Sequence, residues 1–380
     1  MDARTANTWI EVSAGAVANN VAVFREMVGS DRALMAVVKS NAYGHGLHEV
    51  AGIALRSGAD WLGVFWVEEG LALRKRGVDA PILVFGPVPE DTLDRAIAAG
   101  LRLTAASPKA ATSIAARPAV RGARVHLKVE TGTNRQGMLA GELPAAIRVL
   151  QGAGVVIEGV YTHFADIEDT TEHVFAEKQK ARFGEVLDEL RSIGVDVPMP
   201  HTACTAAAIL FPETHHTLVR AGIGLYGLWP SKETNVSANA LGRNRIGLRP
   251  AMTWKTRIAQ IKCVVAGDYV GYGRTFRTTR STLLAVLPVG YADGYDRGLS
   301  NAARTIVRGV RAPVVGRVCM NMTMIDVSDV PGAAEGDEVV LLGSQGDESV
   351  TAEDLARLAG TINYEIVTRA APGAPRIVVP

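Results

Sequence analysis

The sequence predicts two domains, an N-terminal (β/α)8 barrel of the TIM type followed by a mostly-β domain. Three observations lead to this expectation. The 380 residues exceed what one compact core usually holds. Short apolar runs alternate with helical patterns over roughly the first 240 residues, and this rhythm stops after about Asn244. We therefore expect the barrel in residues 1–244 and the mostly-β domain in residues 245–380.

Eight short apolar runs in the N-terminal part are the candidate strands of the barrel. Several are rich in Val or Leu, and none alternates regularly with polar residues, which is typical of parallel strands buried on both faces. In chain order they are Ala33–Val38, Trp61–Phe65, Pro81–Phe85, Arg102–Ala106, Val125–Val129, Val156–His163, Met199–Ala203 and Leu218–Ile223.

Stretches of helical periodicity lie between these runs, and glycines stand where the helices are expected to end. Eight consecutive strand–helix units in about 240 residues match the size and order of a (β/α)8 barrel. A doubly wound sheet has a similar rhythm, but eight consecutive units favour closure. The clearest helical stretches are Val67–Arg76, Asp91–Ala99, Ala145–Gln151 and Glu177–Ser192, and the glycines are Gly58, Gly77, Gly100, Gly154 and Gly194.

The C-terminal part carries short β-like runs separated by Gly, Pro, Asp and Ser. Only Ala352–Leu358 has a clear helical pattern there. This composition favours a mostly-β domain. The expected strands are Thr282–Leu287, Thr305–Val310, Val314–Val318, Met322–Val327 and Glu338–Leu342.

Composition argues against several classes of function. Lys and Arg number 40 and Asp and Glu 39, so the net charge of +1 indicates no nucleic-acid partner. The three cysteines, Cys204, Cys263 and Cys319, are scattered and indicate neither a disulfide framework nor a metal site. No leader-like segment or membrane-length apolar run stands out, so we expect a cytoplasmic protein without a membrane partner.

A lysine stands at the end of the first predicted strand. Burial penalises the ammonium form of Lys39, and a desolvated lysine with a lowered pKa is suited to forming a Schiff base with a carbonyl cofactor. Considered alone, a strand-end lysine more often reaches out to solvent.

The other strand ends strengthen the cofactor interpretation. Loops after the seventh and eighth strands of barrels often bind phosphate, and here they offer Thr205 and the backbone near Gly222 and Ile223. A lysine opposite such a phosphate site suits pyridoxal 5'-phosphate. Further polar residues at strand ends are Lys128, Arg135, His163, His201 and Arg220.

At these residues the chain resembles the alanine racemase family. The segment from Ala36 to Gly46, around Lys39, is similar to the cofactor-lysine signature of that family. Six further motifs follow in matching order along the chain. They are Glu158–Phe164, Val219–Gly227, Gly271–Phe276, Pro288–Gly294, Gly316–Met320 and Ile362–Glu365.

The resemblance implies an isomerase that interconverts L-alanine and D-alanine on a pyridoxal-phosphate aldimine by two-base proton transfer. Lys39 matches the lysine that carries the cofactor and acts as one base, and Tyr272 matches the base on the opposite face. A tyrosine is ordinarily protonated at neutral pH, so its anion needs support, and His163 and Arg220 match the residues that provide it. Arg220 also matches the partner of the pyridine nitrogen.

The remaining site residues are implied by the same resemblance. Arg135 and the backbone amide of Met320 match the site for the substrate carboxylate. Lys128 matches a lysine that is carbamylated in many relatives, which would relieve a like-charge clash with Arg135. The residues that match the cofactor site are Tyr43, His201, Thr205, Gly222, Ile223 and Tyr364.

The family further implies a homodimer in which Tyr272 and Met320 reach the site of the partner subunit, and a role in supplying D-alanine for peptidoglycan. Three alternatives remain: a serine or broad-specificity racemase, a pyridoxal-phosphate-dependent decarboxylase, and a cofactor binder without catalysis. Departures from the common family pattern include Cys204 before Thr205 and Asn321 after Met320. They leave the affinity for the cofactor and the range of substrates open.

Overall fold

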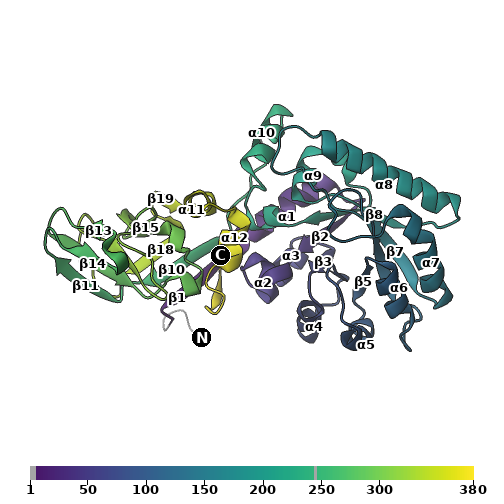
Figure 1. Ribbon diagram of the computed structural model, residues 1–380, viewed down its shortest axis with the longest axis horizontal. Helices are drawn as coiled ribbons and strands as arrows, with labels where there is room; N and C mark the ends of the chain where they lie inside the picture. Colours follow the sequence, from purple (N-terminus) through teal and green to yellow (C-terminus); the bar gives the residue numbers. More distant parts are fainter. Residues whose placement is uncertain (1–5, 244–245) are drawn as a thin grey trace. The chain divides into compact units, whose positions relative to one another are not determined.

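The computed structural model describes residues 6–243 and 246–380, which divide into two compact units (Figure 1). The barrel unit comprises Ala16–Ala42 and Val50–Arg249, and the β unit comprises Met1–Gly15, Tyr43–Glu49 and Pro250–Pro380. The predicted boundary between residues 244 and 245 lies outside the described residues and stays a prediction. The grouping of two N-terminal segments with the β unit was not evident from the apolar pattern.

Within residues 6–243 the barrel unit holds eight parallel strands that follow one another in chain order, with the last strand paired to the first. The sheet nearly closes, because the amide of Thr217 donates to Pro200 O (3.3 Å) and that of Arg220 to Ala203 O (3.1 Å). The predicted barrel is confirmed. Its strands are β2 (Ala33–Val37), β3 (Trp61–Val64), β4 (Ile82–Val84), β5 (Arg102–Ala105), β6 (Arg124–Lys128), β7 (Val156–Tyr161), β8 (Met199–His201) and β9 (Leu218–Ala221).

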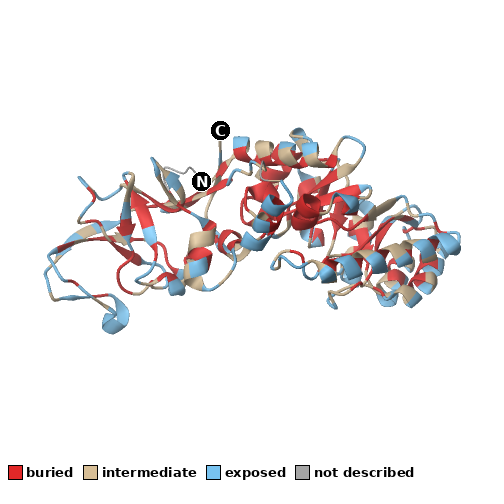
Figure 2. Cartoon of the chain, turned by 90° about the horizontal axis from the view of Figure 1, so that it is seen from above, coloured by how far each residue is buried: buried red, intermediate tan, exposed pale blue. Residues whose placement is uncertain are grey.

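Helices cover the outside of this sheet, as Figure 1 shows for α4 to α8, so the strands are buried on both faces (Figure 2). The five glycines expected at helix ends all have positive φ, between 63° and 110°. The helices are α1 (Ala14–Val28), α3 (Leu47–Arg56), α4 (Val67–Lys75), α5 (Glu90–Ala98), α6 (Pro108–Ala115), α7 (Leu143–Gly152), α8 (Val174–Ser192), α9 (Thr205–Leu210) and α10 (Lys232–Ala240).

The β unit is built around a larger sheet with the order β16-β15-β18-β10-β1-β20, in which β19 also pairs with β18. Smaller sheets join β11, β14 and β17, and β12 with β13. The elements are β1 (Thr8–Ser13), β10 (Met252–Arg257), β11 (Gln260–Val264), β12 (Tyr269–Val270), β13 (Phe276–Arg277), β14 (Thr282–Leu287), β15 (Arg304–Val307), β16 (Val310–Pro313), β17 (Thr323–Asp326), β18 (Glu338–Gln345), β19 (Glu348–Val350), β20 (Arg376–Val379), α11 (Ala352–Ala359) and α12 (Asn363–Arg369).

Two expectations for this unit were wrong. The run predicted as Thr305–Val310 is a hairpin that turns at Arg308 and Gly309, both with positive φ (53° and 78°). The second strand of this hairpin, β16, ends at Pro313, so the residues predicted as the strand Val314–Val318 form none, and Val314 keeps only an isolated bridge to Ile325. Helix α12 was missed because β-branched residues in its second half favour strands.

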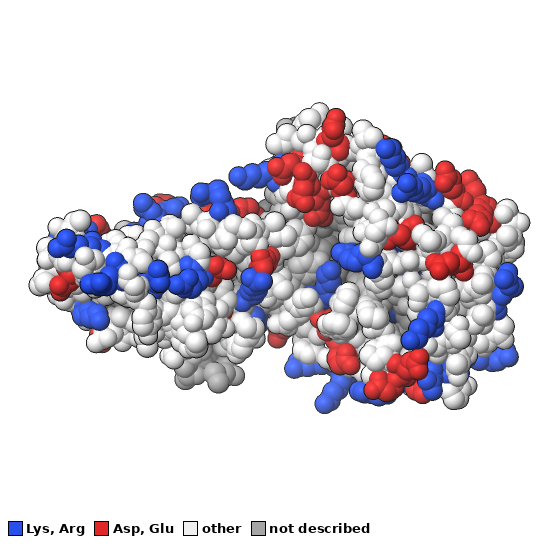
Figure 3. Space-filling view, viewed as in Figure 1, with Lys and Arg blue, Asp and Glu red and all other residues white. Residues whose placement is uncertain are grey.

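The surface carries both signs of charge on each unit, as the face in Figure 3 shows. Among the described residues, none of the helices is long and apolar enough to cross a membrane.

Candidate active site

Lys39 lies two residues after the last residue of β2, at the C-terminal end of the barrel strands, and is half-buried. Burial and the positive charge of Arg135 lower the pKa of its amine, and the carboxylates of Glu69 and Glu168 oppose that shift only in part. A larger fraction of Lys39 is therefore unprotonated than of an ordinary lysine. An unprotonated amine can attack a carbonyl carbon or accept a proton.

The backbone immediately after Lys39 is strained. Ser40, Asn41, Ala42 and Tyr43 all have left-handed φ values, between 52° and 55°. For residues other than glycine this conformation costs about 1–2 kcal/mol each. Strain of this kind persists only where surrounding structure enforces it, and it concentrates at functional sites.

Arg220, at the third position of β9, connects several of the strand ends. Its Nη1 donates to His201 Nδ1 (2.7 Å) and to the carbonyl of His201 (3.0 Å). Its Nη2 donates to the carbonyls of Thr162 (2.8 Å) and Thr202 (2.9 Å), and lies 3.5 Å from His163 Nδ1. Arg220 is 5% exposed, and these contacts hold its guanidinium at the ends of β7 and β8.

These contacts determine which histidine nitrogens carry protons. A guanidinium can only donate hydrogen bonds, so Nδ1 of His201, 2.7 Å away, must accept and this ring carries its proton on Nε2. The longer contact of 3.5 Å favours the same arrangement for His163. Burial, together with the charge of Arg220, holds the pKa of both histidines well below the usual value. Both rings are therefore neutral at physiological pH, and His163 presents an N–H at Nε2.

We expect the buried neutral histidines to make the chain less stable in mild acid. Burial lowers the pKa of His126, His163 and His201. Below about pH 6.5 the unfolded chain binds protons that the folded chain does not, so the free energy of unfolding falls as pH falls, by up to about 1.4 kcal/mol per pH unit for each histidine. Urea unfolding at about pH 7.5 and about pH 5.5 measures this difference in the free energy of unfolding. The variant His126→Phe should lose less stability over the same interval, and equal losses would contradict the assignment.

Lys128, the last residue of β6, lies under the site and is 5% exposed. Its Nζ is 4.7 Å from the centroid of the Tyr161 ring and has no hydrogen-bond partner among the described residues. Burial and the charge of Arg220 hold the pKa of its amine well below the ordinary value. Arg135 is exposed, and its charge also lowers the pKa of Lys39, Lys128 and His163.

The loops after β8 and β9 meet at Thr205. Its hydroxyl oxygen accepts from the amide of Gly222 (2.9 Å) and more weakly from that of Gly224 (3.4 Å). These bonds leave the hydroxyl proton able to point toward an anion. A Cβ on Gly224 would lie 2.5 Å from Phe24 and 2.8 Å from Thr205, so only glycine allows this close approach. Ile223 begins the short 3-10 turn that follows.

Four predicted site residues belong to the β unit. Tyr43 and Tyr364 lie near one another, with ring centroids 6.2 Å apart. Tyr272 and Met320 are exposed, 73% and 56% respectively. The structure therefore brings together Lys39, Lys128, Arg135, His163, His201, Thr205 and Arg220 in the barrel unit, and places Tyr43, Tyr272, Met320 and Tyr364 in the β unit.

Sequence reasoning missed three residues beneath the site. The Tyr161 ring stacks on His201 at a centroid distance of 4.7 Å, and burial raises the pKa of its phenol to about 12. His126 lies behind His201, and Glu158 lies behind His126. No signal in the single sequence marked Tyr161 as part of the site or paired His126 with Glu158.

Other reactive groups are not arranged for chemistry. Among the described residues no group of three or more His, Cys, Asp or Glu side chains could hold a metal ion. Burial raises the pKa of the Cys204 thiol to about 11, so it stays protonated and unreactive.

Comparisons with known proteins agree over the whole chain. The family model for the alanine racemase N-terminal domain matches residues 12–230, and that for the C-terminal domain matches residues 251–378. The alanine racemase of Leptospira interrogans serogroup Icterohaemorrhagiae serovar Lai is 38% identical over 377 residues, which cover 99% of this chain and 96% of that protein. The alanine racemase of Desulfosudis oleivorans is 42% identical over 383 residues, covering 98% and 96%.

Solved structures give the same result. The crystal structure of alanine racemase from Bacillus anthracis with bound L-Ala-P has a TM-score of 0.91 and 38% identity, and the match covers 98% of this chain and 95% of that one. The alanine racemase from a D-cycloserine-producing Streptomyces lavendulae has a TM-score of 0.88 and 36% identity, covering 98% and 97%.

Proposed function

The chain belongs to the alanine racemase family, an isomerase family, and from that premise we propose that it interconverts L-alanine and D-alanine with Lys39 and Tyr272 as its two bases. The observation that supports this assignment most is the surroundings of Lys39. A half-buried lysine of lowered pKa lies at the C-terminal end of a barrel, close enough to Arg135 and Arg220 for both charges to act on it. Functional residues gather at this end of such barrels.

The residues at this site fit pyridoxal 5'-phosphate, which we infer to be the cofactor. When bound, it supplies a carbonyl that an amine can attack and a ring that draws electrons from the substrate. Lys39 provides the amine. The hydroxyl of Thr205, beside the amides of Gly222 and Gly224, would hold the phosphate, and Tyr43 and Tyr364 would contribute their phenols to the same group.

Arg220 would meet the ring nitrogen of the cofactor. Because a guanidinium keeps its protons and only donates, it can bind this nitrogen without protonating it. An aspartic acid in its place would favour a protonated ring and stronger electron withdrawal. The five contacts of Arg220 with His163, His201 and two further carbonyls hold it in this donor role.

Inversion at the α-carbon requires that protons leave and arrive on opposite faces. Lys39, when unprotonated, accepts a proton on one face, and Tyr272 donates one on the other; the reverse reaction exchanges the roles. The N–H at Nε2 of His163 suits a group that stabilises the phenolate of Tyr272. Arg135 and the amide of Met320 would bind the substrate carboxylate, for which a guanidinium has a matching pair of donors.

We further propose a homodimer in which Tyr272 and Met320 complete the site of the partner subunit. Both side chains are more than half exposed in the single chain, so a second copy can cover them. The proposed product, D-alanine, would serve peptidoglycan synthesis.

Carbamylation of Lys128 is expected. Burial and the charge of Arg220 hold the pKa of its amine well below the ordinary value. The unprotonated amine can attack carbon dioxide, forming an N–C bond and losing one proton, and the resulting anion would pair with Arg135 and Arg220. Exchange against 13C-bicarbonate should give one protein-bound carbamate signal in the 13C NMR spectrum. That signal should be absent from Lys128→Ala and present in Lys178→Ala, an exposed lysine of α8. A wild-type spectrum without it would exclude the modification.

Formation of D-isomers tests the function directly. We expect the purified chain to convert L-alanine faster than L-serine, because we propose that Tyr364 narrows the pocket for the substrate side chain. Preference for serine would assign a serine racemase with the same chemistry. If neither amino acid racemises although the cofactor is bound, the proposed function is wrong, and a decarboxylase or a cofactor binder becomes the better interpretation.

A further inference from the structure

A line of polar side chains runs from Arg220 into the interior of the barrel. We propose that His126 and Glu158 are positioning residues for the reaction: with His201 they form a one-directional hydrogen-bond chain that holds Arg220 in place. The inference rests on the proposed function in one respect, that Arg220 serves racemisation.

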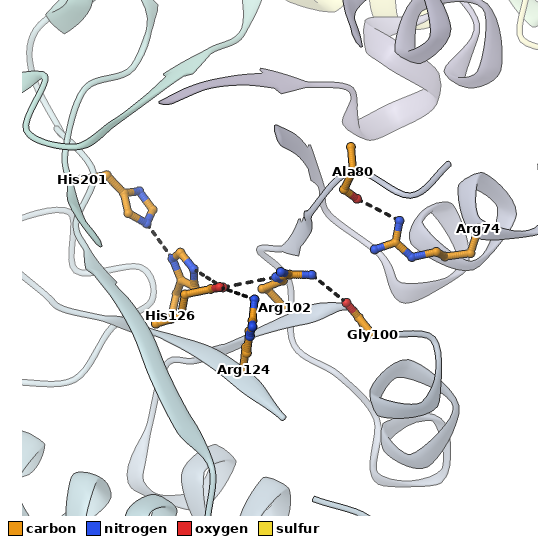
Figure 4. A network of polar contacts seen from close by, with 8 residues as sticks. Arg74, Ala80, Gly100, Arg102, Arg124, His126 and His201 are labelled. Carbon is orange, nitrogen blue, oxygen red and sulfur yellow. Dashed lines mark hydrogen bonds and ion pairs between the residues drawn. The ribbon is translucent and has the colours of Figure 1, made fainter. Parts of the chain in front are cut away.

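The chain of contacts is continuous over four residues. Arg220 Nη1 lies 2.7 Å from His201 Nδ1, His201 Nε2 lies 2.8 Å from His126 Nδ1, and His126 Nε2 lies 3.4 Å from Glu158 Oε2. Figure 4 shows the rings of His201 and His126 facing one another along this line. Both histidines are completely buried.

The donor at one end, Arg220, and the acceptor at the other, Glu158, give the hydrogen-bond chain one direction. Arg220 can only donate, so His201 must accept at Nδ1 and donate from Nε2. His126 must then accept at Nδ1 and donate from Nε2, and the carboxylate of Glu158 accepts at the end. Reversing either histidine would set two N–H groups against each other at one contact and two lone pairs at another. The tautomers of both rings are therefore determined by residues on opposite sides of them.

Glu158 is held as an anion by two arginines that begin neighbouring strands. Arg102 Nε lies 3.2 Å from its Oε2, and Arg124 Nη1 lies 3.1 Å from its Oε1. Burial opposes ionisation of Glu158, but the hydrogen bond to His126 and the charge of Arg102 keep the pKa of the carboxyl below the ordinary value. Arg102 is itself held by the carbonyl of Gly100 (3.1 Å).

The local backbone is shaped to make this contact. Val125 pairs with Ile157 and His126 with Gly159, so the register shifts there and Glu158 is the extra residue of a bulge. A Cβ on Gly159 would lie 2.3 Å from His126 Nδ1, so glycine leaves room for the ring. Barrel interiors are ordinarily filled by branched apolar side chains, which would avoid the cost of burying these polar groups.

This arrangement has a consequence for Arg220. If His126 no longer accepts from His201, the N–H at Nε2 of His201 is buried without its acceptor, and only the contact with Arg220 still opposes a shift of the proton to Nδ1. An N–H would then face the guanidinium, the 2.7 Å contact would be lost, and Arg220 would no longer be held where it is proposed to meet the cofactor ring.

Histidine NMR and kinetics together test the inference. The full-length chain, labelled with 15N-histidine, should show His126 and His201 neutral with the proton on Nε2 at neutral pH. The variant His126→Phe keeps an aromatic ring of somewhat larger size and removes both nitrogens. We expect its His201 signals to move toward a mixture of tautomers and its kcat for alanine to fall by about 10-fold or more, with KM changed much less. Glu158→Gln, which keeps the size of the side chain, should change the His126 signals and lower kcat less.

His215→Phe is the matched control. His215 is also buried in the barrel unit, but it does not belong to the hydrogen-bond chain: its Nε2 bonds to Ala208 O at 3.0 Å. Its loss should lower the thermal midpoint but leave the His201 signals and kcat near wild type. A wild-type His201 protonated on Nδ1, or a His126→Phe variant that behaves like His215→Phe, would overturn the inference. If His126→Phe does not fold, Glu158→Gln decides by the same two readouts. If the wild-type protein fails to racemise alanine, only the proposed function is refuted. The NMR measurement still decides the direction of the hydrogen-bond chain.

Discussion

Replacing Lys39 with alanine is expected to abolish racemisation, with a loss in kcat of about 10⁴-fold or more. The substitution removes the amine that would attach the cofactor and also the base on one face of the substrate. Burial and the charge of Arg135 lower the pKa of this amine, which lies at the C-terminal end of the barrel strands. D-Alanine formation from L-alanine, followed by chiral chromatography, measures the effect.

A matched control separates loss of chemistry from loss of fold. Lys178→Ala, on the exposed side of α8, should keep wild-type activity. Lys39→Ala should retain the far-ultraviolet circular dichroism of the wild type while losing the visible absorbance of lysine-bound cofactor. If the variant keeps more than about a tenth of the wild-type rate, a base worth 10²-fold or more cannot be at this position, and Lys39 would not be the residue proposed.

The barrel could be predicted from the sequence because each of its strands is a short apolar run buried on both faces. Such a run appears in the sequence without knowledge of its neighbours, and all eight were located to within two residues at either end. The β unit was harder because its strands are short and only partly buried. Strands such as β11 (Gln260–Val264) expose most of their residues, and two N-terminal segments join the unit from far away in the chain.

The residues of the candidate site likewise divide into those that the sequence could predict and those that it could not. Lys39, His163, His201 and Arg220 stand at strand ends, where a predicted strand already determines which face of the barrel a residue lies on. His126 and Glu158 stand inside strands, and in a regular ladder the two would not have been expected to face one another. The bulge opposite His126 changes that alternation, and a register shift depends on the pairing of two strands. The left-handed turn after Lys39 likewise lacks a local signal, since three of its four residues, Ser40, Ala42 and Tyr43, rarely adopt such a conformation.

Replacing Tyr272 with phenylalanine should lower kcat by about 10²–10⁴-fold, because it removes the proton donor on one face and leaves the ring in place. Tyr269→Phe is the matched control. Tyr269 is another exposed phenol of the β unit, with Arg274 and Arg277 beside its ring, and its substitution should leave the rate nearly unchanged. Racemisation by Tyr272→Phe at the wild-type rate would remove this residue from the mechanism.

Mixing two inactive variants tests whether the site is shared between subunits. In a mixed dimer of Lys39→Ala and Tyr272→Phe, a shared site can combine the intact lysine of one chain with the intact tyrosine of the other, and the second site carries both defects. Random reassembly makes about half of the dimers mixed, each with one complete site, so about a quarter of the wild-type activity should return. If Lys39 and Tyr272 of the same chain formed each site, every site in the mixture would carry one defect and no activity would return. Recovery on mixing therefore supports both the dimer and the exchange of Tyr272, whereas no recovery, with mixed dimers verified by mass spectrometry, places the two bases in one chain.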